Sequence, residues 1–94
     1  WSRATPQERY EILKKASDEV LARKEELGRI LSREEGKTLP EGIGEAMRAG
    51  QILAFFAGET LRLNGEMVTS VRPGVGIEVT REPIGVIGMI TPWN

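Results

Sequence analysis

The segment REPIGVIGMITPWN, residues 81–94, contains the strongest strand signal in the chain. Within it, every position of 84–90 is an apolar residue or a glycine. A strand with one solvated face alternates apolar and polar residues, whereas a parallel strand covered on both faces is a continuous apolar run. The run therefore predicts a buried strand of a parallel sheet over 84–90, with neighbouring strands and covering helices around it.

A turn, Thr91-Pro92-Trp93-Asn94, follows this strand directly. Pro92 has a fixed φ and disfavours the helical conformation for Thr91, so the chain leaves the strand in a defined direction. Trp93 and Asn94 then stand at the carboxyl edge of the sheet, where open α/β sheets bind ligands. An Asn amide there can stabilise an oxyanion, and a Trp ring can form a flat wall. From the tetrapeptide alone, the simpler interpretation is that Trp93 is a core anchor and Asn94 a turn residue.

Two shorter strands precede this segment. The sequence predicts them over 67–71 and 76–81, separated by the turn residues Pro73 and Gly74. Apolar and polar residues alternate in the second strand, as they do in a half-buried hairpin. Because open strand edges pair with another chain unless they are blunted, we expect the hairpin at 66–81 to take part in oligomerisation.

Upstream of the hairpin, charged and helix-forming residues dominate. The spacing of apolar residues predicts three helices, over 6–22, 25–35 and 40–63. The first begins at TPQE, residues 5–8, where the Thr and Glu side chains can form a capping box. The order of elements is therefore helices first and strands second.

The third helix is unusual in its small residues. Its interior glycines, each of which costs about 1 kcal/mol relative to Ala in helix propensity, are Gly42, Gly44, Gly50 and Gly58. We therefore expect this helix to pack against a larger body. The face expected to be buried consists of Ile43, Met47, Gly50, Leu53, Ala54, Ala57 and Leu61.

The charge balance and the missing residue types exclude several kinds of function. With 13 basic and 14 acidic side chains the net charge is −1, so no basic excess favours nucleic acid or an acidic membrane. The absence of Cys and His excludes a thiolate nucleophile, an imidazole base and a thiolate-and-imidazole zinc site, and no metal site is expected. The glycine patterns at 74–76 and 85–88 do not match a dinucleotide fingerprint, which has three glycines at a strand-to-helix junction.

The length of 94 residues allows a single small core. No apolar run approaches the ~20 residues of a membrane span and nothing resembles a signal peptide, so we expect a cytoplasmic protein. Because residue 1 is Trp and a strongly apolar strand near the other end has no closing element, we also expect these residues to be part of a longer chain.

Residues 81–94 as a whole closely resemble the signature of the NAD(P)-dependent aldehyde dehydrogenase superfamily. Upstream, EGKT at 35–38 is similar to the Glu-Thr-Gly-Lys segment of that family, and FFAG at 55–58 follows at the family's spacing. The resemblance spans essentially all of the chain. It also places Glu35 near the position of a ligand for a structural monovalent cation in some relatives.

The resemblance implies an α/β fold, namely the amino-terminal part of a Rossmann-type cofactor domain. The helices between 6 and 63 would form its outer layer, 66–81 an oligomerisation hairpin of a homodimer or homotetramer, and 84–90 an early strand of the parallel sheet. Residues 1–94 would then be an incomplete cofactor-binding domain.

The resemblance also implies an enzyme that oxidises an aldehyde to a carboxylate with NAD or NADP. The details are most similar to dehydrogenases of dicarboxylic semialdehydes such as α-ketoglutaric semialdehyde. Asn94 would be the catalytic donor to the oxyanion, and with Ile90, Thr91, Pro92 and Trp93 it would line the nicotinamide half of the cofactor site. The family's nucleophilic Cys, Glu base and phosphate-binding turn lie further along the chain, so these residues alone cannot catalyse the reaction.

An alternative of a different class is a non-catalytic helical interaction module, in which the helices and the hairpin bind a partner without chemistry. The sequence that follows residue 94 separates the two interpretations, because the enzyme requires Phe-Pro next and a Cys later.

Overall fold

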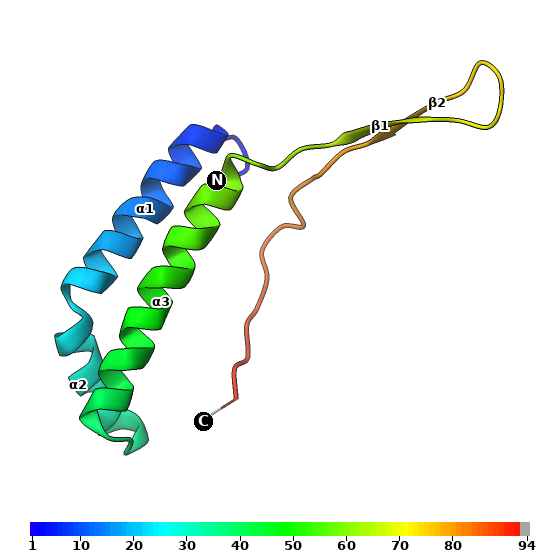
Figure 1. The fold of residues 1–94 in the computed structure, drawn as a ribbon. Helices are drawn as coiled ribbons and strands as arrows, with labels where there is room; N and C mark the ends of the chain where they lie inside the picture. The colour runs from blue at the N-terminus through cyan, green and yellow to red at the C-terminus, as the bar shows by residue number, and fades with distance from the viewer. Residues whose placement is uncertain (93–94) are drawn as a thin grey trace.

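Three helices followed by a β-hairpin form the chain, which we describe over residues 1–92 from a computed structural model. The elements are α1 (Pro6–Ala22), α2 (Lys24–Glu35), α3 (Leu39–Thr60), β1 (Glu66–Thr69) and β2 (Gly76–Val79). The helices form one body, the hairpin projects from it, and the following chain runs back alongside α3 (Figure 1). The Cα radius of gyration is 19.1 Å, against ~13 Å for a compact domain of about 100 residues. The predicted order of elements is confirmed.

Both long helices begin at the capping boxes that their sequences encode. At the start of α1, the Thr5 amide donates to Glu8 Oε2 at 2.7 Å, and the Glu8 amide donates to Thr5 Oγ1 at 3.2 Å. At the start of α3, the Thr38 amide donates to Glu41 Oε2 at 3.0 Å. Each carboxylate satisfies an amide that has no partner within its helix. The bounds of α1 match the prediction, and α2 begins one residue earlier than predicted.

The end of α3 lies at Thr60, short of the predicted end at 63. The amides of Leu61 and Arg62 donate to the carbonyls of Gly58 and Glu59, only three residues back. A turn tightened in this way commonly ends an α-helix. Among the helices of residues 1–92, none combines the length and the apolar character needed to cross a membrane.

Small residues form the contact between α3 and the other two helices. Ser17 Oγ donates to the Gly50 carbonyl at 2.8 Å across the α1–α3 contact. A Cβ placed on Gly50 would lie 2.6 Å from Leu21 Cγ, and a Cβ on Gly42 would lie 2.5 Å from the Gly28 carbonyl oxygen. These backbones can approach so closely because glycine stands at the crossing points.

The buried face of α3 agrees with the predicted one at Gly50 and Ala57 and differs at other positions. Its buried residues are Gly42, Ala46, Gly50, Ala57 and Thr60. Met47 and Leu61, which were expected in the contact, are 39% and 49% exposed. The close approach of the helices places small residues at the crossing points, and the side chains of Met47 and Leu61 are turned out of the contact.

The two remaining glycines of α3 have no such packing role within residues 1–92. A Cβ on Gly44 would meet nothing within 4 Å, and one on Gly58 would meet only the flexible end of Arg62, at 3.5 Å. Within residues 1–92, α3 is therefore buried only on the side that contacts α1 and α2, and the burial expected on its other sides is not seen.

The hairpin is a narrow two-stranded ribbon. β1 and β2 pair antiparallel, with Glu66 opposite Val79 and Val68 opposite Ile77. Both strands are shorter than predicted, and all their residues are exposed. Within residues 1–92 no further strand lies beside the ribbon, so both of its outer edges are open.

The buried strand predicted over 84–90 is not formed within the described chain. Ile84, Val86 and Ile90 are 90%, 104% and 102% exposed, and the segment pairs with no other strand. A strand obtains its backbone hydrogen bonds from a neighbouring strand. Within residues 1–92 this segment pairs with neither open edge of the hairpin, so it has no strand beside it.

Candidate functional site

The structure describes three of the five predicted cofactor-site residues. Trp93 and Asn94 lie outside the described residues. Ile90, Thr91 and Pro92 lie within them and are exposed, with no hydrogen bond or ion pair to another described residue. These three side chains offer an uncharged, largely apolar surface, which can form a wall for a ring but has no titratable group for acid or base chemistry.

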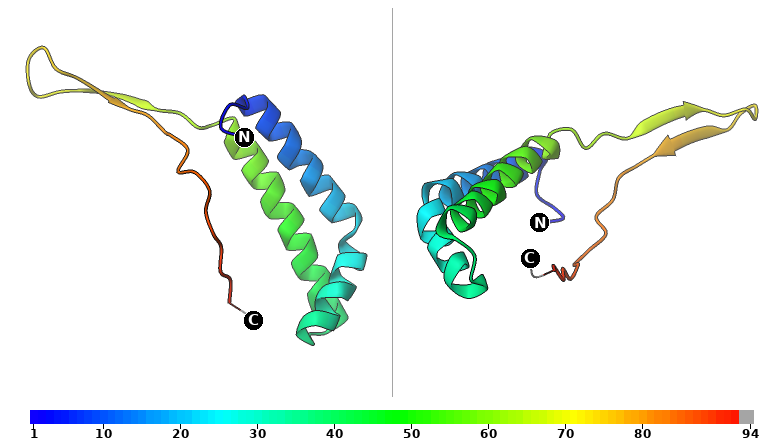
Figure 2. Two further views of the ribbon diagram at one scale, coloured as in Figure 1. Left: turned by 180° about the vertical axis from the view of Figure 1, so that it is seen from behind. Right: turned by 60° about the horizontal axis from the view of Figure 1, so that its bottom comes forward.

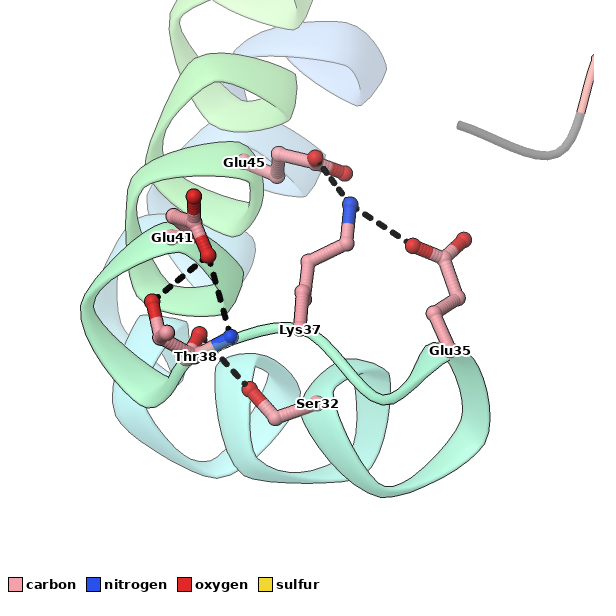
Figure 3. A network of polar contacts seen from close by, with 6 residues as sticks. All are labelled: Ser32, Glu35, Lys37, Thr38, Glu41 and Glu45. Carbon is pink, nitrogen blue, oxygen red and sulfur yellow. Dashed lines mark hydrogen bonds and ion pairs between the residues drawn. The ribbon is translucent and has the colours of Figure 1, made fainter.

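A polar network holds the turn between α2 and α3 (Figure 3). Lys37 Nζ is 2.7 Å from Glu35 Oε2 and also donates to Glu45 Oε1. The Lys37 and Glu35 side chains are 13% and 17% exposed. The hydrogen bonds that the Lys37 ammonium donates to Glu35 and to Glu45 raise the pKa of Lys37. The charged ammonium therefore links the end of α2 to α3.

This network bears on the implied cation position at Glu35. The carboxylate is paired with the Lys37 ammonium, which supplies the positive charge that a cation would bring. Within residues 1–92, no three His, Cys, Asp or Glu side chains gather as a metal-binding group. The sequence analysis did not predict the network. Its signal is Gly36, whose φ of 78° reverses the chain and brings Lys37 back over the helix end.

Thr38 and its partners fix the first turn of α3. Ser32 Oγ donates to the Thr38 carbonyl at 3.2 Å, and Thr38 Oγ1 donates to Glu41 Oε2 at 2.6 Å (Figure 3). The hydrogen bonds from the Thr38 side chain and backbone lower the pKa of Glu41. These hydrogen bonds make the Glu41 carboxylate the cap of α3.

A second feature that the sequence analysis missed is a groove on α3, opposite its contact with α1 and α2. We call it the outer groove, and it is lined by Arg48, Gln51, Ile52, Phe55 and Phe56. The two Phe rings meet edge to face, with centroids 5.2 Å apart. The signal for this groove is the presence of apolar residues all round α3, since a helix of that kind is normally covered on every side.

Comparison with known proteins identifies the family. The model of the aldehyde dehydrogenase family matches residues 1–94. The chain therefore belongs to the aldehyde dehydrogenase family, and the resemblance of 81–94 to its signature is confirmed. Three helices followed by an antiparallel hairpin are consistent with the amino-terminal part of an α/β domain of this family.

Several curated relatives align with the whole chain. It is 42% identical over 94 residues to α-ketoglutaric semialdehyde dehydrogenase of Bacillus subtilis. This alignment covers 100% of the chain and 19% of that relative. It is 38% identical over 94 residues to mitochondrial succinate-semialdehyde dehydrogenase of Arabidopsis thaliana, covering 100% of the chain and 18% of the relative. A 3-sulfolactaldehyde dehydrogenase of Pseudomonas putida is also 38% identical over 94 residues, with coverage of 100% and 19%. The chain thus spans about a fifth of the length of these relatives.

Proposed function

We propose that the protein containing these residues oxidises a dicarboxylic semialdehyde to the corresponding carboxylate, with NAD or NADP as the hydride acceptor. The observation that carries the proposal is the alignment of the whole chain with relatives named as semialdehyde dehydrogenases, at 42% and 38% identity. Because the family match includes the hairpin and the final segment as well as the helices, a non-catalytic helical interaction module is not favoured.

In this proposal, Ile90, Thr91 and Pro92 hold the nicotinamide half of the cofactor. Their exposed, uncharged surface suits a flat ring better than it suits charged phosphate groups. NAD(P)⁺ supplies the hydride acceptor for the oxidation. Trp93 and Asn94, which lie outside the described residues, are proposed as a wall of the site and as the donor to the oxyanion that forms when a nucleophile adds to the aldehyde.

The helices have a supporting role in the proposal. The contact of α3 with α1 and α2 sets the position of the chain that leads into the hairpin and the final segment. We assign residues 1–94 to an incomplete cofactor-binding domain and 66–81 to its oligomerisation hairpin. Support for the hairpin's role comes from its two open edges and from the exposure of all its strand residues.

The test of the proposed activity is a rate measurement on the purified full-length protein. Reduction of NAD⁺ and of NADP⁺ is followed by absorbance with succinic semialdehyde, α-ketoglutaric semialdehyde and uncharged butanal. We expect saturable reduction with the semialdehydes and formation of one carboxylate product per reduced nicotinamide. Absence of nicotinamide reduction with every aldehyde would contradict the proposal.

A further inference from the structure

The junction between α3 and β1 contains a dipeptide, Asn64-Gly65, that has no part in the proposed activity. The chain leaves the helical body through this junction and enters the projecting hairpin (Figure 1 and Figure 2). Both residues are exposed, and neither the side-chain amide of Asn64 nor the main-chain amide of Gly65 forms a hydrogen bond with another residue of the described chain. An Asn side chain can be attacked by the main-chain nitrogen that follows it, and glycine presents that nitrogen without a Cβ beside it.

Arg81 binds the peptide bond that joins these two residues. Its Nε donates to the main-chain oxygen of Asn64 at 3.2 Å. Loss of the Gly65 amide proton spreads a negative charge over the nitrogen and this oxygen, because the two atoms share the resonance of one peptide unit. A guanidinium stays charged in proteins, and a hydrogen bond from a charged donor stabilises an anion more than one from a neutral donor. Arg81 therefore favours the ionised Gly65 amide, which is the form that attacks.

We propose that Asn64 is a site of spontaneous deamidation in the folded protein and that Arg81 promotes the reaction. Hydroxide removes the Gly65 amide proton, and the nitrogen attacks Cγ of Asn64. The N–Cγ bond forms, the Cγ–Nδ2 bond breaks, and the leaving nitrogen takes up a proton from water and departs as ammonia. Water then opens the cyclic succinimide at Cγ to give aspartate, or at the main-chain carbonyl carbon of residue 64 to give isoaspartate.

The isoaspartyl product alters the base of the hairpin. Its main chain passes through the former side chain and is one carbon longer directly before Gly65. Little space is available there, because even a Cβ placed on Gly65 would collide with the Val79 carbonyl oxygen. The extra carbon must therefore displace β1 from β2 at the first pair of the ribbon, Glu66 opposite Val79. We expect the modification to loosen this end of the hairpin.

The reaction is measured on the purified full-length protein, incubated in mildly alkaline buffer either folded or in denaturant. Cleavage after glutamate releases residues 60–66, in which Asn64 carries the only side-chain amide, and mass spectrometry follows its conversion to an acid. We expect conversion in the folded protein as well as in denaturant. Asn64→Gln, whose side chain would have to close a larger ring, should keep its amide over the same time. Conversion confined to the denatured protein would overturn the proposal.

Substitution of Arg81 separates its effect from that of the dipeptide. Arg81→Met should slow conversion in the folded protein by roughly 2- to 10-fold, the rate equivalent of one net hydrogen bond, and leave the rate in denaturant unchanged. Arg81→Gln, which keeps a donor without the charge, should have an intermediate rate. The matched control is Arg72→Met, because Arg72 is an exposed arginine of the same hairpin whose side chain has no partner among the described residues.

The Arg72→Met protein should react at the wild-type rate. Equal rates for wild type and Arg81→Met in the folded state would overturn the role of Arg81. If Arg81→Met does not fold, Arg81→Gln carries the comparison, and a wild-type rate for that variant overturns the role of the charge.

The effect on the hairpin is measured in the modified protein, which anion exchange separates by its additional negative charge. Amides of β1 should exchange with deuterium faster than in the unmodified protein, because local opening governs exchange. Freshly purified Asn64→Asp, which has the charge without the longer main chain, should keep the protection of the unmodified protein. Equal protection of β1 in the modified and unmodified proteins would overturn the predicted loosening.

Discussion

The helical body and the segment at 82–92 are both rich in apolar residues, yet they reach different states. In the helical body, every α-helical hydrogen bond joins residues four apart, so each helix forms from its own sequence and then packs. The apolar run at 84–90 needs another strand for its hydrogen bonds, and it stays exposed in the described chain. Helices, which need only nearby residues for their hydrogen bonds, therefore form within residues 1–92. The strand predicted at 84–90 needs a partner strand and does not form there.

The same two regions differ in what they contribute to the proposed enzyme. The helices hold the chain in place, and the final segment supplies the residues proposed for the chemistry. Substitutions in the helical body should therefore change stability, and substitutions in the final segment should change turnover. Substitutions in the hairpin, which lies between the two regions in the sequence, should change the oligomeric state.

Deletion of residues 67–80 from the full-length protein should have the largest effect. Because the deletion removes both open strand edges, we expect loss of the native oligomer, with monomers or aggregate in its place. Light scattering coupled to size-exclusion chromatography measures the mass. A variant of the parental oligomeric mass would show that the hairpin is not the interface.

Asn94→Ala should have the next largest effect, confined to the chemical step. Loss of a donor to the oxyanion lowers kcat by ~10²–10³-fold, which corresponds to about 3–4 kcal/mol. Asn94→Asp should be slower still, because a carboxylate repels the oxyanion. Steady-state kinetics on the full-length enzyme provide the measurement, and an unchanged thermal midpoint is the control. Near-normal turnover of the Asn94→Ala enzyme, with the chemical step still rate-limiting, would show that Asn94 does not donate to the oxyanion.

A pair of glycine substitutions in α3 tests whether the helical body governs stability. Gly42→Ala should lower the free energy of unfolding by roughly 1–3 kcal/mol, because the new Cβ would lie 2.5 Å from the Gly28 carbonyl oxygen. Gly44→Ala should raise it by up to about 1 kcal/mol, because its Cβ meets nothing within 4 Å and Ala favours the helix. Thermal midpoints of the two variants should move in opposite directions, and shifts of the same sign would contradict the observed helix contact.

The smallest expected effect concerns the cap of α3 and its dependence on pH. Thr38 lowers the pKa of Glu41 in the folded state, so the carboxylate stabilises the fold fully above the ordinary glutamate pKa of about 4.3. This contribution is lost as the pH falls through the lower folded value. Glu41→Gln should therefore lower the thermal midpoint at neutral pH and have a progressively smaller effect in acid. A difference between wild type and variant that stays constant with pH would show that the charge of Glu41 has no part in the cap.

The sequence predicts the parts of the fold that depend on neighbouring residues. The capping box of Thr5 and Glu8 and the bounds of α1 follow from a few adjacent side chains. The buried face of α3 follows only in part, because the pattern placed Gly50 and Ala57 in it but also Met47 and Leu61. Burial of Gly42 depends on how closely α2 approaches, which the pattern does not contain.

The candidate site shows the same division. The family signature in 81–94 points to Ile90, Thr91 and Pro92, since the motif is contiguous in the sequence. The contact of Lys37 with Glu45 could not be predicted from spacing, because it depends on the reversal of the chain at Gly36.

The separation between the helices and the apolar run has a consequence for biosynthesis. The ribosome makes α1, α2 and α3 before residues 84–90, and their mutual contacts involve only residues already synthesised. The helices can therefore associate while the apolar run is still emerging. At about 5–20 residues per second, each further 50 residues of a nascent chain take roughly 3–10 s, and the run stays uncovered until its partner strands exist.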